Sequence, residues 1–423
     1  MARDKRNLNV AFVGHVDHGK STTIGRLMFD LGHVSQQELD KLRAEAEKHG
    51  KLGFEFAFVM DKFKEERERG VTIDLSYKKL NTQKYQITII DAPGHKDFIK
   101  NMITGASQAD AAFLTVSALE GVQPQTKEHL WLLRTMGVRQ IAILINKMDR
   151  VGYKEDAFNK TKAEVSALLK QVGINPEKTT FIAGSGLKGD NIAKKSENMP
   201  WYKGPTVLEQ FDKFEEPAAL AQYPLRMPIQ DAYEITGIGT VPVGKIITGA
   251  IKVGQKVIIL PGRSGTGIQG EVRTIEMHHE QMPEAQAGDN VGVNIRGVGK
   301  KDVARGDVIC DAAKPAPVVK EFTAMITVIN HQTVIAKGYT PVFHVHTGQV
   351  PCQFTELLEK REGDQVIKNP DFLKNGDIAK VRITPMGNLV LEKQSDNPMM
   401  SGFAIRDAGA TVAAGVCVEL VAK

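Results

Sequence analysis

The sequence predicts an α/β domain with a mostly parallel sheet and helices on both faces, followed by two all-β segments. Three observations support this prediction. At 423 residues the chain is long enough for roughly three domains. Strand and helix patterns alternate through the first half, which is typical of parallel sheets with crossover helices. Beyond residue 223 helix patterns become scarce, and short β-branched runs recur every 8–12 residues or so, which indicates barrels or sandwiches.

The first half contains short apolar runs that we expect to be strands, and periodic segments that we expect to be helices. The predicted strands are 9–13, 85–90, 111–116, 140–145 and 180–183. The predicted helices are 21–32, 97–107, 124–137 and 154–172. The segment 54–70 carries i,i+4 pairs of opposite charge, so it is expected to be helical too. Ligands of parallel sheets bind at the carboxyl ends of the strands, where the motifs below lie.

Two breaks divide the chain. Residues 214–222 are rich in Glu, Ala and Pro and are typical of an interdomain linker. Residues 311–317 carry two prolines and split the β-rich half into segments of about 90 and 105 residues. We therefore predict domains at 1–222, 223–314 and 315–423.

The composition indicates an ordinary soluble globular protein. Hydrophobic residues make up 42% and charged residues 25% of the chain. The net charge of +5 permits an anionic partner without arguing for one. The three cysteines, Cys310, Cys352 and Cys417, match no zinc or redox spacing, so we expect them to be reduced and buried. Neither a signal peptide nor an apolar run of about 18 residues is visible, so we expect a cytoplasmic protein with no membrane partner.

A phosphate-binding loop follows the first predicted strand and opens the first predicted helix, matching the pattern G-x-x-x-x-G-K-S. Glycines let backbone N–H groups face phosphate oxygens, and the helix N-terminus adds partial positive charge. Lys20 is expected to reach the β- and γ-phosphates, and the Ser21 hydroxyl to bind Mg²⁺. The predicted residues of this site are Gly14, His15, Val16, Asp17, His18, Gly19, Lys20, Ser21 and Thr22.

A second phosphate-side motif follows the strand at 85–90. An aspartate at this position can hold Mg²⁺ through water, and the glycine N–H can face the γ-phosphate. The motif is weak alone because Asp-x-Pro-Gly is a common turn, but its place after a strand favours the functional interpretation. Thr72 is the candidate second Mg²⁺ ligand, in a mobile switch loop. The motif residues are Asp91, Ala92, Pro93 and Gly94.

Two further motifs predict recognition of guanine. The Asp149 carboxylate can accept from both N1–H and the 2-amino group of guanine, a donor pair that adenine lacks. Backbone N–H groups after the strand at 180–183 are placed to contact the guanine O6. The residues concerned are Asn146, Lys147, Met148 and Asp149, and Ser185, Gly186 and Leu187. Together the motifs indicate a site for GTP and GDP with Mg²⁺.

The whole set of motifs resembles the translational GTPases, and within them the archaeal and eukaryotic elongation factor 1-alpha family, whose bacterial counterpart is elongation factor Tu. The resemblance covers essentially the whole chain. It is carried by the strings GHVDHGKSTT (14–23), EERERGVTID (65–74), DAPGHKDFIKNMITGAS (91–107), EMHHE (276–280), GYTPVFHVHT (338–347) and residues 405–407.

The resemblance implies a GTP-binding domain followed by two antiparallel β-barrels, and ribosome-stimulated GTP hydrolysis. It implies that His95 orients the attacking water and that Val16 forms one side of an apolar gate. It also implies delivery of aminoacyl-tRNA to the ribosomal A site, with Glu276 near the terminal adenosine and His278 and Asn290 near the aminoacyl group. A guanine-nucleotide exchange factor is the further partner implied, and the protein is expected to be a monomer.

Some features leave alternatives open. Ser185-Gly186-Leu187 lacks the aromatic residue expected after Ser-Gly, and Gly402 stands where the family usually has arginine. His344 and His346 share a strand face, but with no third ligand visible we favour packing or RNA contact over metal.

Two other classes of GTPase are alternatives to this family. Carriers of a release or ribosome-rescue protein usually have long N-terminal extensions and lack the string at 276–280, whereas 13 residues precede Gly14 here. GTPase subunits of sulfate-activating enzymes favour D-T-P-G-H-E over the D-A-P-G-H-K of this chain.

Overall fold

The computed structural model describes residues 5–61, 64–69, 71–215, 220, 222–263, 265–277, 280–362 and 365–423. The chain divides into two compact units, Met1–Arg134 with Val138–Pro217, and Thr135–Gly137 with Ala218–Lys423. No helix in the described part of the chain is long and apolar enough to cross a membrane.

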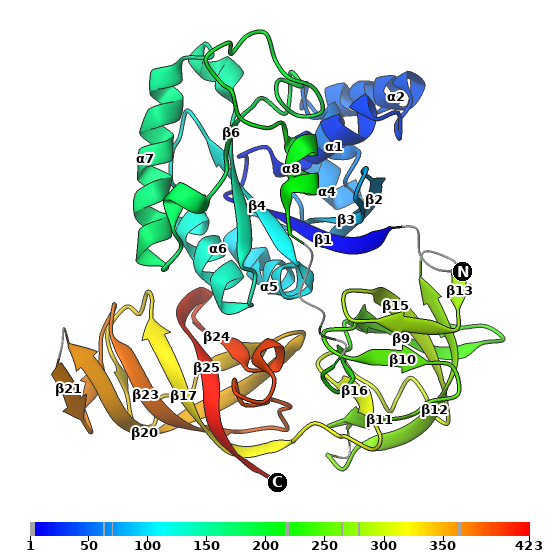
Figure 1. Cartoon of the computed structure of the whole chain (residues 1–423), viewed down its shortest axis with the longest axis vertical. Coiled ribbons are helices and arrows are strands. Elements are labelled where there is room, and N and C mark those ends of the chain that lie inside the picture. The colour runs from blue at the N-terminus through cyan, green and yellow to red at the C-terminus, as the bar shows by residue number, and fades with distance from the viewer. Residues whose placement is uncertain are drawn as a thin grey trace. The chain divides into compact units, whose positions relative to one another are not determined.

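The first unit is an α/β domain (Figure 1). Its strands form one sheet in the order β2-β3-β1-β4-β5-β6. All neighbouring pairs are parallel except β2–β3 at the edge. The strands are β1 Arg6–Val13, β2 Ser76–Asn81, β3 Tyr85–Asp91, β4 Ala111–Ser117, β5 Gln140–Asn146 and β6 Phe181–Ala183. The expected mostly parallel sheet is confirmed.

Helices cover both faces of this sheet. Side chains of α1 and α8 share one core with alternate residues of β1, β3, β4 and β5, whereas α5, α6 and α7 gather on the opposite side in Figure 1. The helices are α1 Lys20–Asp30, α2 Gln36–Lys48, α3 Glu55–Phe58, α4 Lys64–Arg69, α5 Ile99–Gln108, α6 Pro124–Thr135, α7 Glu155–Gln171 and α8 Val207–Lys213.

The single helix predicted over 54–70 is wrong. The chain forms two short helices, α3 and α4, and Val59–Asp61 between them is not part of either helix. Residues 62, 63 and 70 lie outside the described residues. Burial explains the break: Phe56 and Phe58 are 5% and 1% exposed, so α3 packs inward. The charged residues on which the prediction rested lie mostly in α4.

The predicted linker at 214–222 begins too early, because Phe214 and Glu215 are both held by the first unit. Phe214 is 3% exposed and belongs to the core of the first unit. Its carbonyl oxygen accepts a hydrogen bond from the Tyr85 hydroxyl at 3.0 Å. Residues 216–219 and 221 of the predicted linker lie outside the described residues.

In the described residues of the second unit from 220 onward, the regular structure consists of β-strands and one short 3₁₀ helix, Pro398–Met400. The first sheet of this unit runs β7-β16-β11-β12-β15-β9-β8, with β13 paired to β12 and a separate β10–β14 pair. Gln230 N donates to Val243 O at 2.8 Å, which brings the chain after β7 back against β9. Gly244 permits this approach, because an added Cβ would collide with Pro228 O. The strands are β7 Arg226–Pro228, β8 Asp231–Ile235, β9 Gly239–Lys245, β10 Ala250–Lys252, β11 Lys256–Leu260, β12 Ile268–Met277, β13 Glu280–Met282, β14 Glu284–Gln286, β15 Asn290–Arg296 and β16 Val308–Asp311.

The second sheet of this unit closes on itself. It runs β19-β24-β25-β17-β23-β20-β21, and β19 also pairs with β20, which completes a barrel. The strands are β17 Val319–Val328, β18 Ile335–Ala336, β19 Val342–Val345, β20 Gly348–Glu362, β21 Gln365–Lys368, β22 Phe372–Leu373, β23 Ile378–Pro385, β24 Gly402–Asp407 and β25 Ala410–Ala422.

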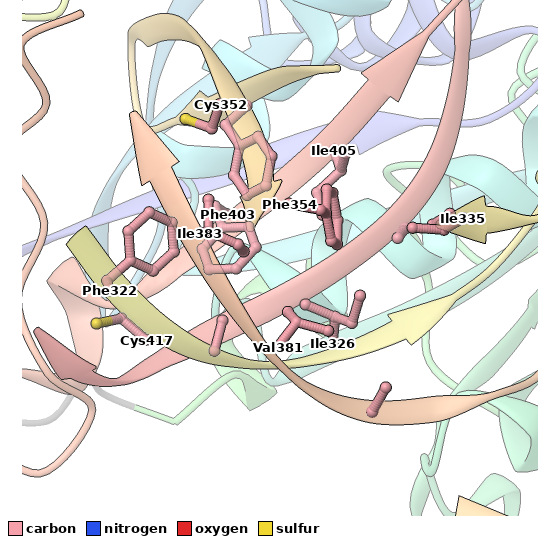
Figure 2. Packing of buried hydrophobic residues seen from close by; sticks show 14 of the residues in the cluster. Phe322, Ile326, Ile335, Cys352, Phe354, Val381, Ile383, Phe403, Ile405 and Cys417 are labelled. Carbon is pink, nitrogen blue, oxygen red and sulfur yellow. The ribbon is translucent and has the colours of Figure 1, made fainter. Parts of the chain in front are cut away.

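Aromatic and aliphatic side chains fill the interior of this barrel (Figure 2). Phe322 and Phe403 meet edge to face with ring centroids 5.7 Å apart, a favoured geometry for aromatic pairs. Cys352 and Cys417 lie in the same core, and Cys310 is buried in β16. All three cysteines are free and buried, as expected.

A buried ion pair joins the two β-rich parts of this unit. Arg226 Nη2 donates to Glu392 Oε1 at 2.6 Å, and the two side chains are only 3% and 10% exposed. Asn397 Nδ2 donates to the other carboxylate oxygen at 2.7 Å. Two buried charges are tolerated here because each is paired and hydrogen-bonded.

We expect Arg226→Met to lower the free energy of unfolding by about 3–5 kcal/mol, because the Glu392 carboxylate stays buried without its counter-ion. Equilibrium urea unfolding followed by circular dichroism measures the change. Arg382→Met is the matched control: Arg382 pairs with Glu356 at 2.8 Å, but both side chains are more than a third exposed, so the loss should stay below about 1 kcal/mol. Equal losses in the two variants would contradict this assignment.

Candidate functional site

The phosphate loop of the first unit connects the end of β1 to the start of α1. Gly14 has a φ of 143°, and an added Cβ would collide with the carbonyl oxygen of Thr115 in β4. Gly19 caps α1 in the left-handed region with a φ of 87°. Both positions therefore require glycine. The loop rests against the carboxyl end of β4, which is where the sheet topology places a ligand site.

Lys20 is buried at the base of this loop. Its Nζ donates to the carbonyl oxygens of Gly14 and His15 at 3.0 and 2.9 Å. Burial lowers the pKa of Lys20 to about 8, and the nearby carboxylates of Asp91 and Asp17 oppose the shift. An anionic ligand in the loop would stabilise the ammonium form, which is what a phosphate-binding lysine requires.

Three oxygen-bearing side chains converge beside Lys20. The hydroxyls of Ser21 and Thr72 lie 3.1 Å apart, although 51 residues separate them in the chain. Asp91 is fully buried, and neither carboxylate oxygen has a hydrogen-bond partner of good geometry among the described residues. Burial raises the pKa of Asp91 to about 6, with Ser21 and Lys20 opposing the shift. A buried carboxylate without a hydrogen-bond partner fits a site for a hard cation, because such cations prefer oxygen ligands.

Asn146 ties the base-recognition loop to the phosphate loop. Its Nδ2 donates to His18 O at 2.9 Å, and its Oδ1 accepts from Gly186 N at 2.8 Å. Ser185 Oγ donates to Asp149 Oδ1 at 2.6 Å and so orients that carboxylate. The residues of the two predicted base-recognition motifs are thus brought together.

These elements enclose a cleft of about 360 Å³. That volume lies within the usual range for small-molecule sites. The predicted residues that line it are Val16, Asp17, Gly19, Lys20, Ser21, Thr22, Thr72, Gly94, His95, Asn146, Lys147, Asp149, Ser185, Gly186 and Leu187.

Other predicted residues do not line the cleft. Met148 is fully buried and Ala92 lies in the core, so neither side chain faces a ligand. Further predicted residues that do not line it are Gly14, His15, His18, Asp91 and Pro93, which belong to the same loops.

The cleft also contains residues that the motifs do not predict: Leu52, Gly53, Phe54, Ala57, Val71 and Arg150. Leu52 is 72% exposed, which is unusual for a large apolar side chain. Exposure is a property of the folded chain, so the sequence alone offers no signal for this segment.

His95 stands at the cleft beside Gly94. Its Nδ1 accepts a hydrogen bond from Asp97 N at 3.3 Å, and the ring lies 5.8 Å from that of Phe98. The same Nδ1 lies 3.4 Å from Asp97 Oδ2. The side chain is 37% exposed, so it can move toward a ligand without disrupting a core.

Two of the predicted tRNA-contact residues lie on neighbouring strands of the second unit. Glu276, exposed on β12, pairs with Gly292 of β15. Asn290 begins β15 two residues earlier, and side chains two residues apart point to the same face. Glu276 and Asn290 therefore share one face of the sheet. His278 lies outside the described residues.

The expectation that His344 and His346 share a strand face is wrong. Strand β19 ends at Val345, and His346 has a φ of 50°, so the alternation stops between them. His344 is 4% exposed, which favours packing. The described part of the chain contains no group of three or more His, Cys, Asp or Glu that could hold a metal ion.

Comparisons with known proteins cover the whole chain. Residues 5–218 match the elongation factor Tu GTP binding domain family, 239–310 match elongation factor Tu domain 2, and 321–418 match the GTP-eEF1A C-terminal domain-like family. Elongation factor 1-alpha of Methanocaldococcus jannaschii is 56% identical over 430 residues, with 100% of both chains covered. Elongation factor 1-alpha of Archaeoglobus fulgidus is 53% identical over 426 residues, again with 100% of both covered.

Solved structures share the fold at lower identity. The GTPase-like domain of S. cerevisiae Ski7, bound to GDP and inorganic phosphate, has a TM-score of 0.80 at 17% identity, covering 98% of this chain and 97% of that chain. Translation elongation factor SelB from Methanococcus maripaludis, in complex with a GTP analogue, has a TM-score of 0.72 at 22% identity, covering 99% and 80%.

Proposed function

The chain belongs to the elongation factor 1-alpha family of translational GTPases, and from that premise we propose that it binds aminoacyl-tRNA in the GTP state, delivers it to the ribosomal A site and releases it after hydrolysis. The observation that carries the proposal is identity of 53–56% to elongation factors 1-alpha along the full length, together with a cleft lined by the guanine and phosphate motifs. The enzymatic activity is hydrolysis of GTP to GDP and phosphate.

In this proposal the phosphate loop holds the β- and γ-phosphates while Asp149 reads the base. Lys20 exchanges its contacts with the loop carbonyls for phosphate oxygens, and backbone N–H groups of the loop supply further donors. The Asp149 carboxylate, oriented by Ser185, accepts from the guanine N1–H and 2-amino groups. Asn146 holds the two loops at a fixed separation.

His95 has the role of orienting the water that attacks the γ-phosphate. Phosphoryl transfer depends on positioning and charge neutralisation, so an imidazole that aligns a water contributes even without acting as a base. Its place beside Gly94 and Val16 in the cleft supports this role.

We further propose that Mg²⁺ is the cation of this site, held by Ser21 and Thr72 with Asp91 behind them. A cation held there would supply positive charge that neutralises the negative charge developing on the phosphates. The unpartnered, buried Asp91 carboxylate and the paired hydroxyls support the assignment.

Asp91→Asn should abolish most of the Mg²⁺ dependence of nucleotide binding. We expect GDP affinity of the natural chain to be at least about tenfold higher in Mg²⁺ than in chelator, and the variant to show little difference, because carboxylates that orient metal ligands contribute on this scale. Titration with fluorescent GDP, in Mg²⁺ and in chelator, measures the affinity of each protein. Asp40→Asn, on the exposed face of α2, is the control. An unchanged Mg²⁺ dependence in Asp91→Asn would contradict the assignment.

The remaining proposals extend the family assignment. We propose that the domains are 1–222, 223–314 and 315–423, and that Glu276, His278 and Asn290 contact aminoacyl-tRNA. We also propose that the protein acts in the cytoplasm as a monomer and is recharged by a guanine-nucleotide exchange factor.

Filter binding of labelled aminoacyl-tRNA separates this proposal from its alternatives. We expect tight binding with a non-hydrolysable GTP analogue, weak binding with GDP, and weak binding of deacylated tRNA in either state. A carrier of a release or rescue protein, or a subunit of a sulfate-activating enzyme, would bind none of these tRNAs tightly. Equal affinity in the two nucleotide states would also contradict the proposal.

A further inference from the structure

A buried histidine outside every predicted motif contacts the phosphate loop. His129 lies in α6 and is fully buried. Its Nδ1 accepts a hydrogen bond from the backbone N–H of Gly14 at 3.0 Å, across 115 residues of sequence. A side chain from the middle of a crossover helix thus holds the first residue of the loop.

The chemistry of this contact defines the state of the imidazole. Because Nδ1 accepts, the proton of a neutral His129 lies on Nε2. Burial holds the pKa of His129 well below its ordinary value, and the charge of Lys20 and the neighbouring histidines act in the same direction. Nε2 has no hydrogen-bond partner among the described residues. A buried donor without a partner costs stability that a leucine at this position would avoid.

Gly14 is a junction of the site because both of its flanking peptides are held. Its N–H, in the Val13–Gly14 peptide, donates to His129 Nδ1. Its carbonyl oxygen, in the Gly14–His15 peptide, accepts from Lys20 Nζ at 3.0 Å. On the third side Gly94 approaches so closely that an added Cβ would lie 2.8 Å from Gly14 O. A shift of the Gly14 backbone would therefore displace both Lys20 and the Asp91–Gly94 segment.

We propose that His129 is a positioning residue for nucleotide binding. Its Nδ1 holds the Gly14 N–H and so restrains the Gly14 backbone, whose carbonyl oxygen in turn sets the resting place of Lys20. The inference rests on the proposed function, because the ligand that the loop binds is taken to be GTP or GDP. The competing explanation for the burial of His129 is simple core packing. In that explanation the hydrogen-bond acceptor Nδ1 has no role in nucleotide binding.

Two substitutions separate the acceptor from the volume of the ring. His129→Asn places an amide oxygen close to the position of Nδ1 and keeps the hydrogen bond. His129→Leu keeps the bulk and removes the acceptor. Leu133→Val, one turn along the same buried face, is the control for packing in α6. Fluorescent GTP and GDP titrations give the affinities, and thermal unfolding of each variant without nucleotide gives stability independently.

We expect His129→Leu to weaken binding of both nucleotides about tenfold, the equivalent of one lost hydrogen bond, and His129→Asn to recover most of it. Leu133→Val should lower the unfolding temperature without lowering affinity. Unchanged affinity in His129→Leu, or losses in the His129 variants that merely follow thermal stability, would overturn the inference. A natural chain that binds no guanine nucleotide would instead overturn the proposed function.

A second measurement needs no substitution. The ¹⁵N chemical shifts of the His129 ring report its tautomer directly. The inference requires an unprotonated Nδ1 and a protonated Nε2 from pH 6 to 8. An Nδ1–H tautomer or an imidazolium in that range would overturn it.

Discussion

Replacing His95 with alanine is expected to slow ribosome-stimulated GTP hydrolysis by several orders of magnitude while leaving GTP affinity nearly unchanged. The ring lines the cleft beside Gly94, but it is more than a third exposed and takes no part in the hydrogen bonds that shape the phosphate loop. In the proposed function, nucleotide binding rests on Lys20, the loop backbone and Asp149, none of which the substitution alters. Single-turnover hydrolysis on programmed ribosomes, together with GTP titration, measures both quantities.

Two further variants define how His95 acts. His95→Gln should retain part of the hydrolytic activity, because an amide can orient a water molecule although it cannot serve as a base near neutral pH. His33→Ala, an exposed histidine beyond α1, should leave hydrolysis unchanged. A large loss of GTP affinity in His95→Ala would show that the ring binds nucleotide and does not position water.

Asp149→Asn is expected to shift the nucleotide preference from guanine to xanthine. The carboxylate accepts from two donors of guanine, and an amide nitrogen at one oxygen position would instead face the 2-amino group. Xanthine carries an oxygen there and restores the match. A site built to hydrogen-bond a ligand discriminates by a factor of about 10⁴–10⁵ against an analogue that lacks the hydrogen-bonding group. The ratio of GTP affinity to XTP affinity should therefore change by several orders of magnitude.

Competition of GTP, XTP and ATP against fluorescent GDP or XDP measures the shift. Asp156→Asn, an exposed acidic residue at the start of α7, is the control and should keep the preference for GTP. Ser185→Ala should weaken GTP binding without admitting XTP, because it removes the 2.6 Å hydrogen bond that orients Asp149 but leaves the carboxylate. Unaltered base discrimination in Asp149→Asn would refute the role of this residue.

The sheet of the first unit could be predicted because strands buried on both faces are continuous apolar runs. β3, β4 and β5 each match their predicted ranges within a residue or so at the ends. The same runs place the motifs, because ligand-binding loops follow the carboxyl ends of parallel strands. This is why the sequence could place most of the predicted phosphate and guanine residues at one cleft.

Helices α2 and α8 are absent from the predicted elements, yet their N-termini carry a readable signal. Ser35 with Glu38, and Thr206 with Glu209, form reciprocal capping boxes. A search for S/T-x-x-E would have found both. By contrast, the break between α3 and α4 depends on the burial of aromatic side chains in the folded chain. Local charge pairs in the sequence do not predict that burial.

The contacts that shape the cleft from a distance could not be predicted. His129 meets Gly14 only because α6 packs under the loop, and no spacing in the sequence distinguishes it from an ordinary buried histidine. Leu52 and Phe54 line the cleft for the same reason. The proposal of tRNA contacts rests on resemblance alone. The sheet register shows only that Glu276 and Asn290 lie on one face.

The most direct test is to measure whether GTP hydrolysis is coupled to delivery of aminoacyl-tRNA. Ribosomes with a filled P site and a defined A-site codon are mixed with this protein, labelled GTP and aminoacyl-tRNA, and phosphate release and dipeptide formation are followed together. The account predicts rapid hydrolysis only with codon-matched aminoacyl-tRNA, and dipeptide in proportion to phosphate. Hydrolysis that is indifferent to the codon and to aminoacyl-tRNA, with no dipeptide formed, would contradict it.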